Sequence, residues 1–212
     1  ATVLRAPDRL TAAQKRTTVT LYLAGPFDDA DTWRDEVIGA YDDLDITVID
    51  PRNERWPQLE VGSPGRRGAF EWQCAAAFDA DVVIVWVPAG RHAPTALMIL
   101  GSLGAKRNNP KRGSSVVVGG GGYDGLVQLF AQNQRLFPAG DDLGEVIRIA
   151  RIQLEQALAD LNKALKANAK EWEVPFDFPE GADPKAKPAF EAFHAARQAT
   201  RASARVVRVR RK

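Results

Sequence analysis

One apolar stretch decides the fold class: Val82-Val83-Ile84-Val85-Trp86-Val87 follows Asp81 without a polar interruption. A strand with such a continuous run is buried on both faces, which is typical of parallel sheets covered by helices on both sides. Shorter strand-like runs precede and follow it, and helical patterns lie between them. The chain is therefore predicted to form an α/β domain with a doubly wound parallel sheet and right-handed crossovers.

The alternation around this run predicts the other elements. Further strands are expected at residues 17–24, 46–49 and 116–118, and helices at 32–44, 68–80, 94–106 and 126–136. Ligands of such sheets bind outside the carboxyl ends of the strands. The expected ligand edge therefore consists of residues 24–29, 50–57, 88–95 and 119–125.

Composition divides the 212 residues into four parts. A basic extension at 1–16 precedes the α/β domain, which is expected at 17–140. Apolar residues then recur at every third or fourth position from Leu143 to Leu165, which predicts a long amphipathic helix. This helical extension and a proline-rich strap occupy 141–190, and a basic tail occupies 191–212.

The formal net charge of +2 hides an uneven distribution. Seven basic residues and no acid lie between Ala192 and Lys212, which leaves 22 basic against 27 acidic residues before them, a net charge of −5. A basic tail on an acidic body is typical of proteins that bind nucleic acid, and solvated charge on a terminus is the alternative interpretation. The expected nucleic-acid contacts are Arg197, Arg201, Arg205, Arg208, Arg210, Arg211 and Lys212 in the tail, with Lys106, Arg107, Lys111 and Arg112 in a loop.

The composition also excludes several classes. A single cysteine, Cys74, rules out an intramolecular disulfide and favours a reducing intracellular compartment, either the mitochondrial matrix or the cytoplasm. His92 and His194 have no cysteine partners, so neither a metal site nor a cofactor is expected. No apolar run approaches the roughly 20 residues that span a bilayer, so no membrane partner is expected.

Polar groups follow the first two predicted strands. Gly25-Pro26-Phe27 ends the first strand, where the glycine would let a ligand approach the backbone and Trp33-Arg34 nearby suits an anion or sugar. Asp50, Arg52 and Asn53 end the second strand. Their carboxylate, guanidinium and amide suit sugar hydroxyls and base edges, although Gly-Pro and Asp-Pro are also ordinary turn sequences.

Three other loop features are weaker candidates. Trp56 is a candidate for stacking on a base. His92 is a candidate for contact with a phosphate, although an ordinary surface histidine is the favoured interpretation. Gly120, Gly122 and Gly125 match the spacing of a dinucleotide fingerprint. They follow the fourth strand rather than the first, and no acidic residue ends a strand about 20 positions later. A simple turn is therefore the favoured interpretation of these glycines.

Several motifs in order resemble the nucleoside 2-deoxyribosyltransferase-like family. They are Leu23-Ala24-Gly25-Pro26-Phe27, Trp33-Arg34, Val48-Ile49-Asp50-Pro51-Arg52, Phe70-Glu71-Trp72-Gln73 with Ala80-Asp81-Val82-Val83, and Pro94-Thr95-Ala96-Leu97-Met98-Ile99-Leu100-Gly101. The resemblance covers about residues 17–125. It implies a small flavodoxin-like α/β domain that binds nucleosides or nucleotides. It also implies cleavage of the N-glycosidic bond by a glutamate nucleophile through a glycosyl-enzyme intermediate.

The chain departs from this family at the nucleophile. The resemblance places the glutamate in a Leu-Leu-Glu-Leu-Gly-like run, and ungapped alignment on Leu97 and Gly101 puts Ile99 at that position. Isoleucine has no lone pair to attack an anomeric carbon, and covalent catalysis of this type needs the carboxylate. No catalytic residue is therefore expected, and Glu71 and Asp50 are weak candidates for a displaced carboxylate. Asp81, also considered, is expected to start a strand at the opposite edge.

Three functions remain open from the sequence. The favoured hypothesis is a pseudoenzyme without transferase activity, acting as a structural or RNA-binding subunit of a ribonucleoprotein such as a mitochondrial ribosome. The alternative is an active nucleoside or nucleotide N-glycosidase or 2-deoxyribosyltransferase with a displaced carboxylate. The third is a sensor that binds a nucleoside without turnover. The expected partners are RNA or a ribonucleoprotein at the basic tail and a nucleoside or nucleotide in the α/β domain.

Overall fold

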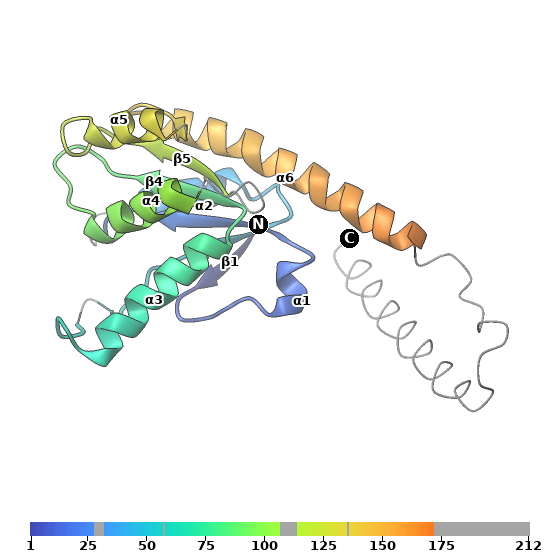
Figure 1. Ribbon diagram of the computed structural model, residues 1–212, viewed down its shortest axis with the longest axis horizontal. Coiled ribbons are helices and arrows are strands. Elements are labelled where there is room, and N and C mark those ends of the chain that lie inside the picture. The colour runs from blue at the N-terminus through green and yellow to red at the C-terminus, as the bar shows by residue number, and fades with distance from the viewer. Residues whose placement is uncertain (28–31, 57, 107–113, 135, 172–212) are drawn as a thin grey trace. The chain divides into compact units, whose positions relative to one another are not determined.

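The computed structural model describes residues 1–27, 32–56, 58–106, 114–134 and 136–171 (Figure 1). The predicted proline-rich strap, the basic tail and Arg107, Lys111 and Arg112 lie outside the described residues, as does the side chain of Lys106. The first compact unit is Ala1–Leu165, and the second, Lys166–Lys212, is described only over its first six residues. In the described ranges, no helix has the length and apolar character needed to cross a membrane.

A parallel sheet forms the centre of the first unit. Its described strands are β1 (Thr2–Arg5), β2 (Val19–Ala24), β3 (Ile46–Asp50), β4 (Val82–Trp86), β5 (Ser115–Gly119) and β6 (Phe137–Pro138). They lie in the order β1-β3-β2-β4-β5-β6, and every neighbouring pair is parallel. Strands β2 to β6 reproduce the flavodoxin-like order 2-1-3-4-5, which confirms the predicted fold class.

The helices of the structure cover both faces of this sheet. They are α1 (Ala12–Lys15), α2 (Trp33–Ala40), α3 (Pro64–Asp79), α4 (Pro94–Lys106), α5 (Leu126–Asn133) and α6 (Leu143–Glu171). One core cluster joins the sheet to α3, α4 and α5, and a second joins it to α2 and α6 (Figure 1). All residues of β2, β3 and β4 are buried, as the continuous apolar run in β4 predicts.

The predicted long amphipathic helix is α6. Its residues Val146, Ala150 and Leu154 repeat at four-residue spacing and are fully buried against the sheet. The hydroxyl of Tyr41 also donates to the carbonyl oxygen of Ile147 at 2.9 Å. The helix is therefore part of the α/β core over its first half, because its apolar stripe covers a face that α2 leaves open.

The N-terminal segment, residues 1–16, is the main difference from the prediction, which placed no strand there. Strand β1 pairs with β3 from Thr2 opposite Thr47 to Arg5 opposite Asp50. The indole nitrogen of Trp72 then donates to the carbonyl oxygens of Pro7 and Asp8 at 3.0 and 3.2 Å. A strand of four residues surrounded by basic side chains has a weak sequence signal, because its stability comes from pairing with a distant strand.

Gly25, directly after β2, gives a test of this packing. A Cβ atom there would lie 2.6 Å from the Trp33 ring and 2.7 Å from the carbonyl oxygen of Trp86. We expect Gly25→Ala to destabilise the fold by about 1–3 kcal/mol in urea unfolding, because neither neighbour is a flexible chain end. The control is Gly39→Ala in α2, where no atom lies within 4 Å of the added methyl group. That variant should gain about 0.5–1 kcal/mol, and equal effects of the two changes would contradict the packing.

Candidate functional site

The carboxyl ends of β2 and β3 meet at one buried ion pair. Asp50, the last residue of β3, is fully buried, and Arg34 of α2 is 1% exposed. Arg34 Nη1 donates to the carbonyl oxygen of Pro26 at 2.7 Å and Nη2 to that of Gly25 at 3.1 Å. Arg34 Nε lies 3.9 Å from Asp50 Oδ1. One guanidinium therefore connects the loop after β2 to the end of β3.

Arg52 holds the same carboxylate from the other side. Its Nε donates to Asp50 Oδ2 at 2.8 Å, and its backbone nitrogen donates to Oδ1 at 3.1 Å. The Arg52 guanidinium also donates from both terminal nitrogens to Asp35. These hydrogen bonds hold the pKa of the Asp35 carboxyl below its usual range. Arg5 of β1 adds a third cation, with its Nε 3.7 Å from Asp50 Oδ2.

These contacts give Asp50 a positioning role. Both of its oxygens already accept hydrogen bonds from Arg52, and the carboxylate faces three arginines, Arg5, Arg34 and Arg52. A buried charge is tolerated only when it is paired and hydrogen-bonded in this way. The structure thus brings Asp50 and Arg52 together as the sequence predicts, but their polar atoms bind each other and the protein.

The loop after β2 is closed by its own neighbours. The Trp33 ring fills the space beside Gly25, so this glycine serves close packing of α2 rather than the approach of a ligand. Arg34, expected to contact an anion or sugar, lies between the rings of Trp33 and Phe27, 4.5 and 4.8 Å from their centroids. Pro26 is buried, and Phe27 remains 42% exposed at the edge. Of the predicted residues in this loop, only Phe27 presents its side chain to solvent.

Asn53 and Trp56, expected to bind a sugar and a base, contact other parts of the chain. The Asn53 side-chain amide donates to the carbonyl oxygen of Ala6 at 2.9 Å, and its oxygen accepts from the backbone nitrogen of Arg55. The half-buried Trp56 ring packs edge-on against Trp72, with 5.4 Å between centroids. Both residues therefore help to hold the N-terminal segment and the loop after β3.

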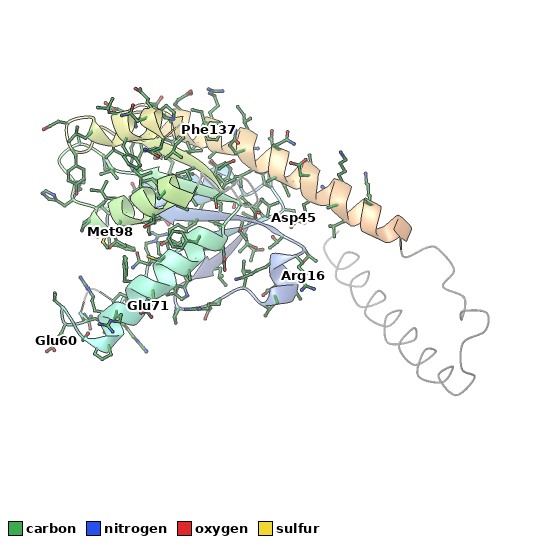
Figure 2. All side chains as sticks on the ribbon, viewed as in Figure 1. Arg16, Asp45, Glu60, Glu71, Met98 and Phe137 are labelled. Atoms are coloured by element: carbon green, nitrogen blue, oxygen red, sulfur yellow. The ribbon has the colours of Figure 1, made fainter. Side chains whose placement is uncertain are left out.

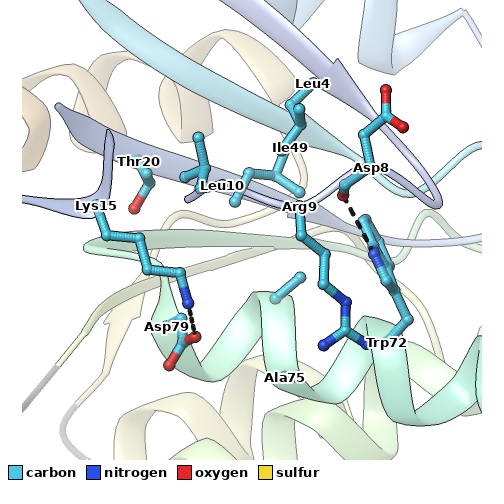
Figure 3. Close-up of a pocket in the computed structure, with 11 residues that line it drawn as sticks. Leu4, Asp8, Arg9, Leu10, Lys15, Thr20, Ile49, Trp72, Ala75 and Asp79 are labelled. Carbon is cyan, nitrogen blue, oxygen red and sulfur yellow. Dashed lines mark hydrogen bonds and ion pairs between the residues drawn. The ribbon is translucent and has the colours of Figure 1, made fainter. Parts of the chain in front are cut away.

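A small cavity lies beneath the N-terminal segment (Figure 3). Its volume is about 70 Å³, and apolar atoms of Leu10, Ile49 and Trp72 line it beside the ion pair between Lys15 and Asp79. Cavities that bind drug-sized ligands usually measure about 300–1,000 Å³. This cavity has room for water and none for a nucleoside.

The loops after β4 and β5 form a second cluster. His92 is exposed, and its ring lies 6.1 Å from the ring of Tyr123, which the sequence analysis did not single out. Tyr123 Oη accepts from the backbone nitrogen of Ala93 at 3.3 Å. The glycine-rich loop packs on Val87, whose carbonyl oxygen accepts from the backbone nitrogen of Gly122 at 2.8 Å. This contact agrees with the interpretation of the glycines as a turn.

The three positions considered for catalysis, Ile99, Glu71 and Asp81, lie in different parts of the domain. Ile99 is 1% exposed and belongs to the core between α4 and the sheet. Glu71 is exposed on the middle of α3 (Figure 2). Asp81 Oδ2 accepts from the backbone nitrogen and hydroxyl of Thr20, both at 2.8 Å, at the amino ends of β2 and β4. The described structure thus gives these residues no shared site.

Tyr22 of β2 is a residue that sequence reasoning missed. It is fully buried on the face toward α3 and α4, in the same core cluster as Ile99. Among the described residues, its hydroxyl has no hydrogen-bond partner. Burial raises the pKa of Tyr22 above its usual range, although the positive charge of Arg34 acts in the opposite direction. The only signal was a tyrosine inside an apolar strand.

This geometry defines the class of the domain: a flavodoxin-like α/β domain with charged residues gathered at the carboxyl ends of two central strands. The family model described as nucleoside 2-deoxyribosyltransferase like matches residues 18–111. This match confirms the resemblance in the motifs: residues 18–111 are similar to the nucleoside 2-deoxyribosyltransferase-like family. The matched region begins after the N-terminal segment and ends before β5. No curated protein matches the chain.

The two buried tyrosines, Tyr22 and Tyr41, test whether a buried hydroxyl has a hydrogen-bond partner. Tyr22→Phe removes a hydroxyl without a described partner and should stabilise the fold at pH 7 by about 1–3 kcal/mol, because a buried hydroxyl without a partner costs about that much. Tyr41→Phe removes the hydrogen bond to Ile147 and should cost about 1 kcal/mol. Urea unfolding measures both. A cost for Tyr22→Phe equal to that for Tyr41→Phe would show that the Tyr22 hydroxyl has a partner.

The same variants also test the burial of the two hydroxyls at alkaline pH. Burial raises the pKa of both tyrosines above their usual value, so the unfolded chain loses these protons first as the pH rises. Stability is complete below about pH 10 and then falls by about 1.4 kcal/mol per pH unit for each tyrosine. Each single variant should therefore remove one such contribution from the alkaline slope.

Proposed function

We propose that this chain is a pseudoenzyme: a nucleoside 2-deoxyribosyltransferase-like domain that has lost transferase activity and serves as a structural or RNA-binding subunit of a ribonucleoprotein. A mitochondrial ribosome is one such assembly. The observation that carries the proposal is Ile99, because the position aligned with the nucleophile holds a core side chain that is 1% exposed. A reaction that needs a carboxylate at this point has no nucleophile there.

The surroundings of Ile99 support the loss of catalysis. Tyr22 belongs to the same apolar cluster, and its hydroxyl finds no partner among the described residues. A polar atom in this position is expected to have a polar neighbour, since an unpaired buried hydroxyl costs about 1–3 kcal/mol. An acidic residue at position 99 would bring a carboxylate into the cluster that holds this hydroxyl, whereas Ile99 keeps that cluster apolar.

The carboxyl edge supports a structural role for the domain. Asp50 accepts a hydrogen bond from Arg52, and Asn53 donates one to the carbonyl oxygen of Ala6. The groups that suit a sugar therefore hold the strand ends together. The N-terminal segment that takes part in these contacts lies outside the region matched by the family model. The edge thus acts as a rigid joint between β2, β3 and α2.

The RNA-binding part of the proposal rests on charge in the sequence. The seven basic residues of the tail would each neutralise a phosphate and release a counterion, so that attachment depends strongly on salt and little on sequence. The acidic body would keep this attachment at the tail, because it repels the phosphate backbone. A body that binds proteins and a tail that binds RNA is a suitable combination for a ribonucleoprotein subunit.

The salt dependence of RNA binding tests this proposal. We expect the logarithm of the association constant of a single-stranded RNA to fall against the logarithm of salt concentration with a slope of about −5, for seven contacts. Replacing Arg197, Arg201, Arg205 and Arg208 by Gln should reduce that slope by about 3. Fluorescence anisotropy at several salt concentrations measures both values.

The matched control replaces four arginines of the body that are exposed, Arg9, Arg16, Arg55 and Arg67, by Gln. This variant removes the same charge and should leave the slope unchanged. Absence of salt-dependent binding by the intact chain would contradict the RNA-binding role. If the control variant lowers the slope as much as the tail variant does, the body and not the tail alone contacts the RNA.

A further inference from the structure

The N-terminal segment, residues 1–16, buries very little of its own surface. Ala6 is the one buried residue in this range, and Leu4 and Leu10 are half-buried. The central strands differ, because every residue of β2, β3 and β4 is buried. Burial of apolar surface is the main source of stability in a folded protein. A segment with so little of it is expected to open at a lower free energy than the core.

Backbone hydrogen bonds attach this segment to the edge of the sheet. Strand β1 is the outer strand, and its four residues pair with β3 alone. Beyond the strand, the backbone nitrogen of Ala6 donates to the carbonyl oxygen of Asp50 at 3.2 Å. An extended peptide that adds a strand to an exposed sheet edge is bound in the same way.

Side chains of the domain then donate to three successive carbonyl oxygens of the segment. The side-chain amide of Asn53 donates to the carbonyl oxygen of Ala6 at 2.9 Å. The indole nitrogen of Trp72 donates to the carbonyl oxygens of Pro7 and Asp8 at 3.0 and 3.2 Å (Figure 3). Carbonyl oxygens are present in every peptide, so these donors recognise an extended backbone rather than one particular sequence.

Two side chains of the segment add selectivity to this contact. Arg5 is 66% exposed, and its Nε lies 3.7 Å from Oδ2 of the buried Asp50. Ala6, the next residue, is 8% exposed and belongs to the core cluster that contains Trp72. The edge therefore favours a cationic residue opposite Asp50 and a small residue directly after it.

The segment does not fill the surface that it covers. The cavity of about 70 Å³ beneath it lies between Leu4 and Leu10 of the segment and Ile49 and Trp72 of the domain (Figure 3). Protein interiors are packed with few voids larger than a water molecule. An occupant with larger apolar side chains would therefore make more contacts with this surface than the segment does.

We propose that the N-terminal segment is a releasable ligand of its own domain: it opens while the domain stays folded, and the edge of β3 then binds an extended peptide of a partner protein. This peptide has a cation opposite Asp50 and a small residue after it. The segment itself selects this occupant, because it already lies on the edge with this chemistry. The region matched by the family model begins after it, at residue 18. The proposal needs neither RNA binding nor loss of activity, so it stands apart from the proposed function.

Hydrogen exchange of the intact chain, followed by mass spectrometry, tests the opening. The amides of residues 2–6 should exchange at least about tenfold faster than those of residues 20–24 in β2. Their rate should change little as urea is raised below the unfolding transition, because local opening exposes little surface. Exchange of both ranges at one rate at every urea concentration would overturn the proposal, since the segment then opens only when the domain unfolds.

Fluorescence anisotropy with a labelled synthetic peptide of residues 2–10 tests binding in trans. In the intact chain this peptide competes with a tethered segment, whose effective concentration is about millimolar. Arg5→Glu in the full chain places two carboxylates side by side and should release the segment, while Asp50, Asn53 and Trp72 stay in place. The apparent dissociation constant of the peptide should then fall at least about tenfold. Thermal unfolding checks that this variant folds.

The matched control is Arg9→Glu, which makes the same charge change in the same segment. Arg9 lies over α3 rather than beside Asp50, as Figure 3 and the contact of Arg5 show, so this variant should bind the peptide as weakly as the intact chain. Adding Asn53→Ala to Arg5→Glu should weaken binding about threefold or more, because one hydrogen bond to the peptide is lost.

Three results of the anisotropy experiment would overturn the proposal. The first is no binding of the peptide by the folded Arg5→Glu chain up to about 500 μM, near a binding free energy of about −4.5 kcal/mol. The second is equal tightening by Arg9→Glu, because the effect is then one of net charge. The third is binding that Asn53→Ala leaves unchanged, because the peptide then occupies another surface.

Discussion

The buried contact of Arg34 with Asp50 is the constraint on which the carboxyl edge of the sheet depends. Moving a guanidinium and a carboxylate out of water costs several kcal/mol for each ion, and good geometry with further hydrogen bonds must offset this cost. Arg34 receives them from the carbonyl oxygens of Gly25 and Pro26, and Asp50 from Arg52. Loss of Asp50 would remove the carboxylate that neutralises the buried Arg34 guanidinium, so α2, β2 and β3 keep one arrangement.

This constraint supports the proposed structural role of the domain. The polar groups that would recognise a sugar are committed to the chain itself, and the N-terminal segment, outside the region matched by the family model, takes part through Arg5 and Ala6. On the other face of the sheet, the cluster that contains Tyr22 and Ile99 is closed and apolar. The basic tail is the part of the chain that we propose to bind RNA.

The features that the sequence predicts correctly depend on residues that are close together in the chain. The run in β4 needs no partner to be recognised as a doubly buried strand, and Asp50 and Arg52 lie together because they follow one strand. Strand β1 was missed because it is stabilised by pairing with β3, more than 40 positions away. The packing requirement for glycine at position 25 could not be predicted for a similar reason, since the Trp33 ring and the Trp86 carbonyl come close to that position only in the folded chain.

The most direct test of the central claim is a time course of free-base release from a panel of deoxynucleosides and nucleotides, followed by chromatography. If the proposed loss of activity is right, the intact chain should release no base above the uncatalysed rate, because Ile99 stands at the position aligned with the nucleophile and Arg34 and Arg52 hold Asp50. Release by the intact chain that Asp50→Asn or Glu71→Gln abolishes would contradict it, and would show that a displaced carboxylate catalyses the reaction.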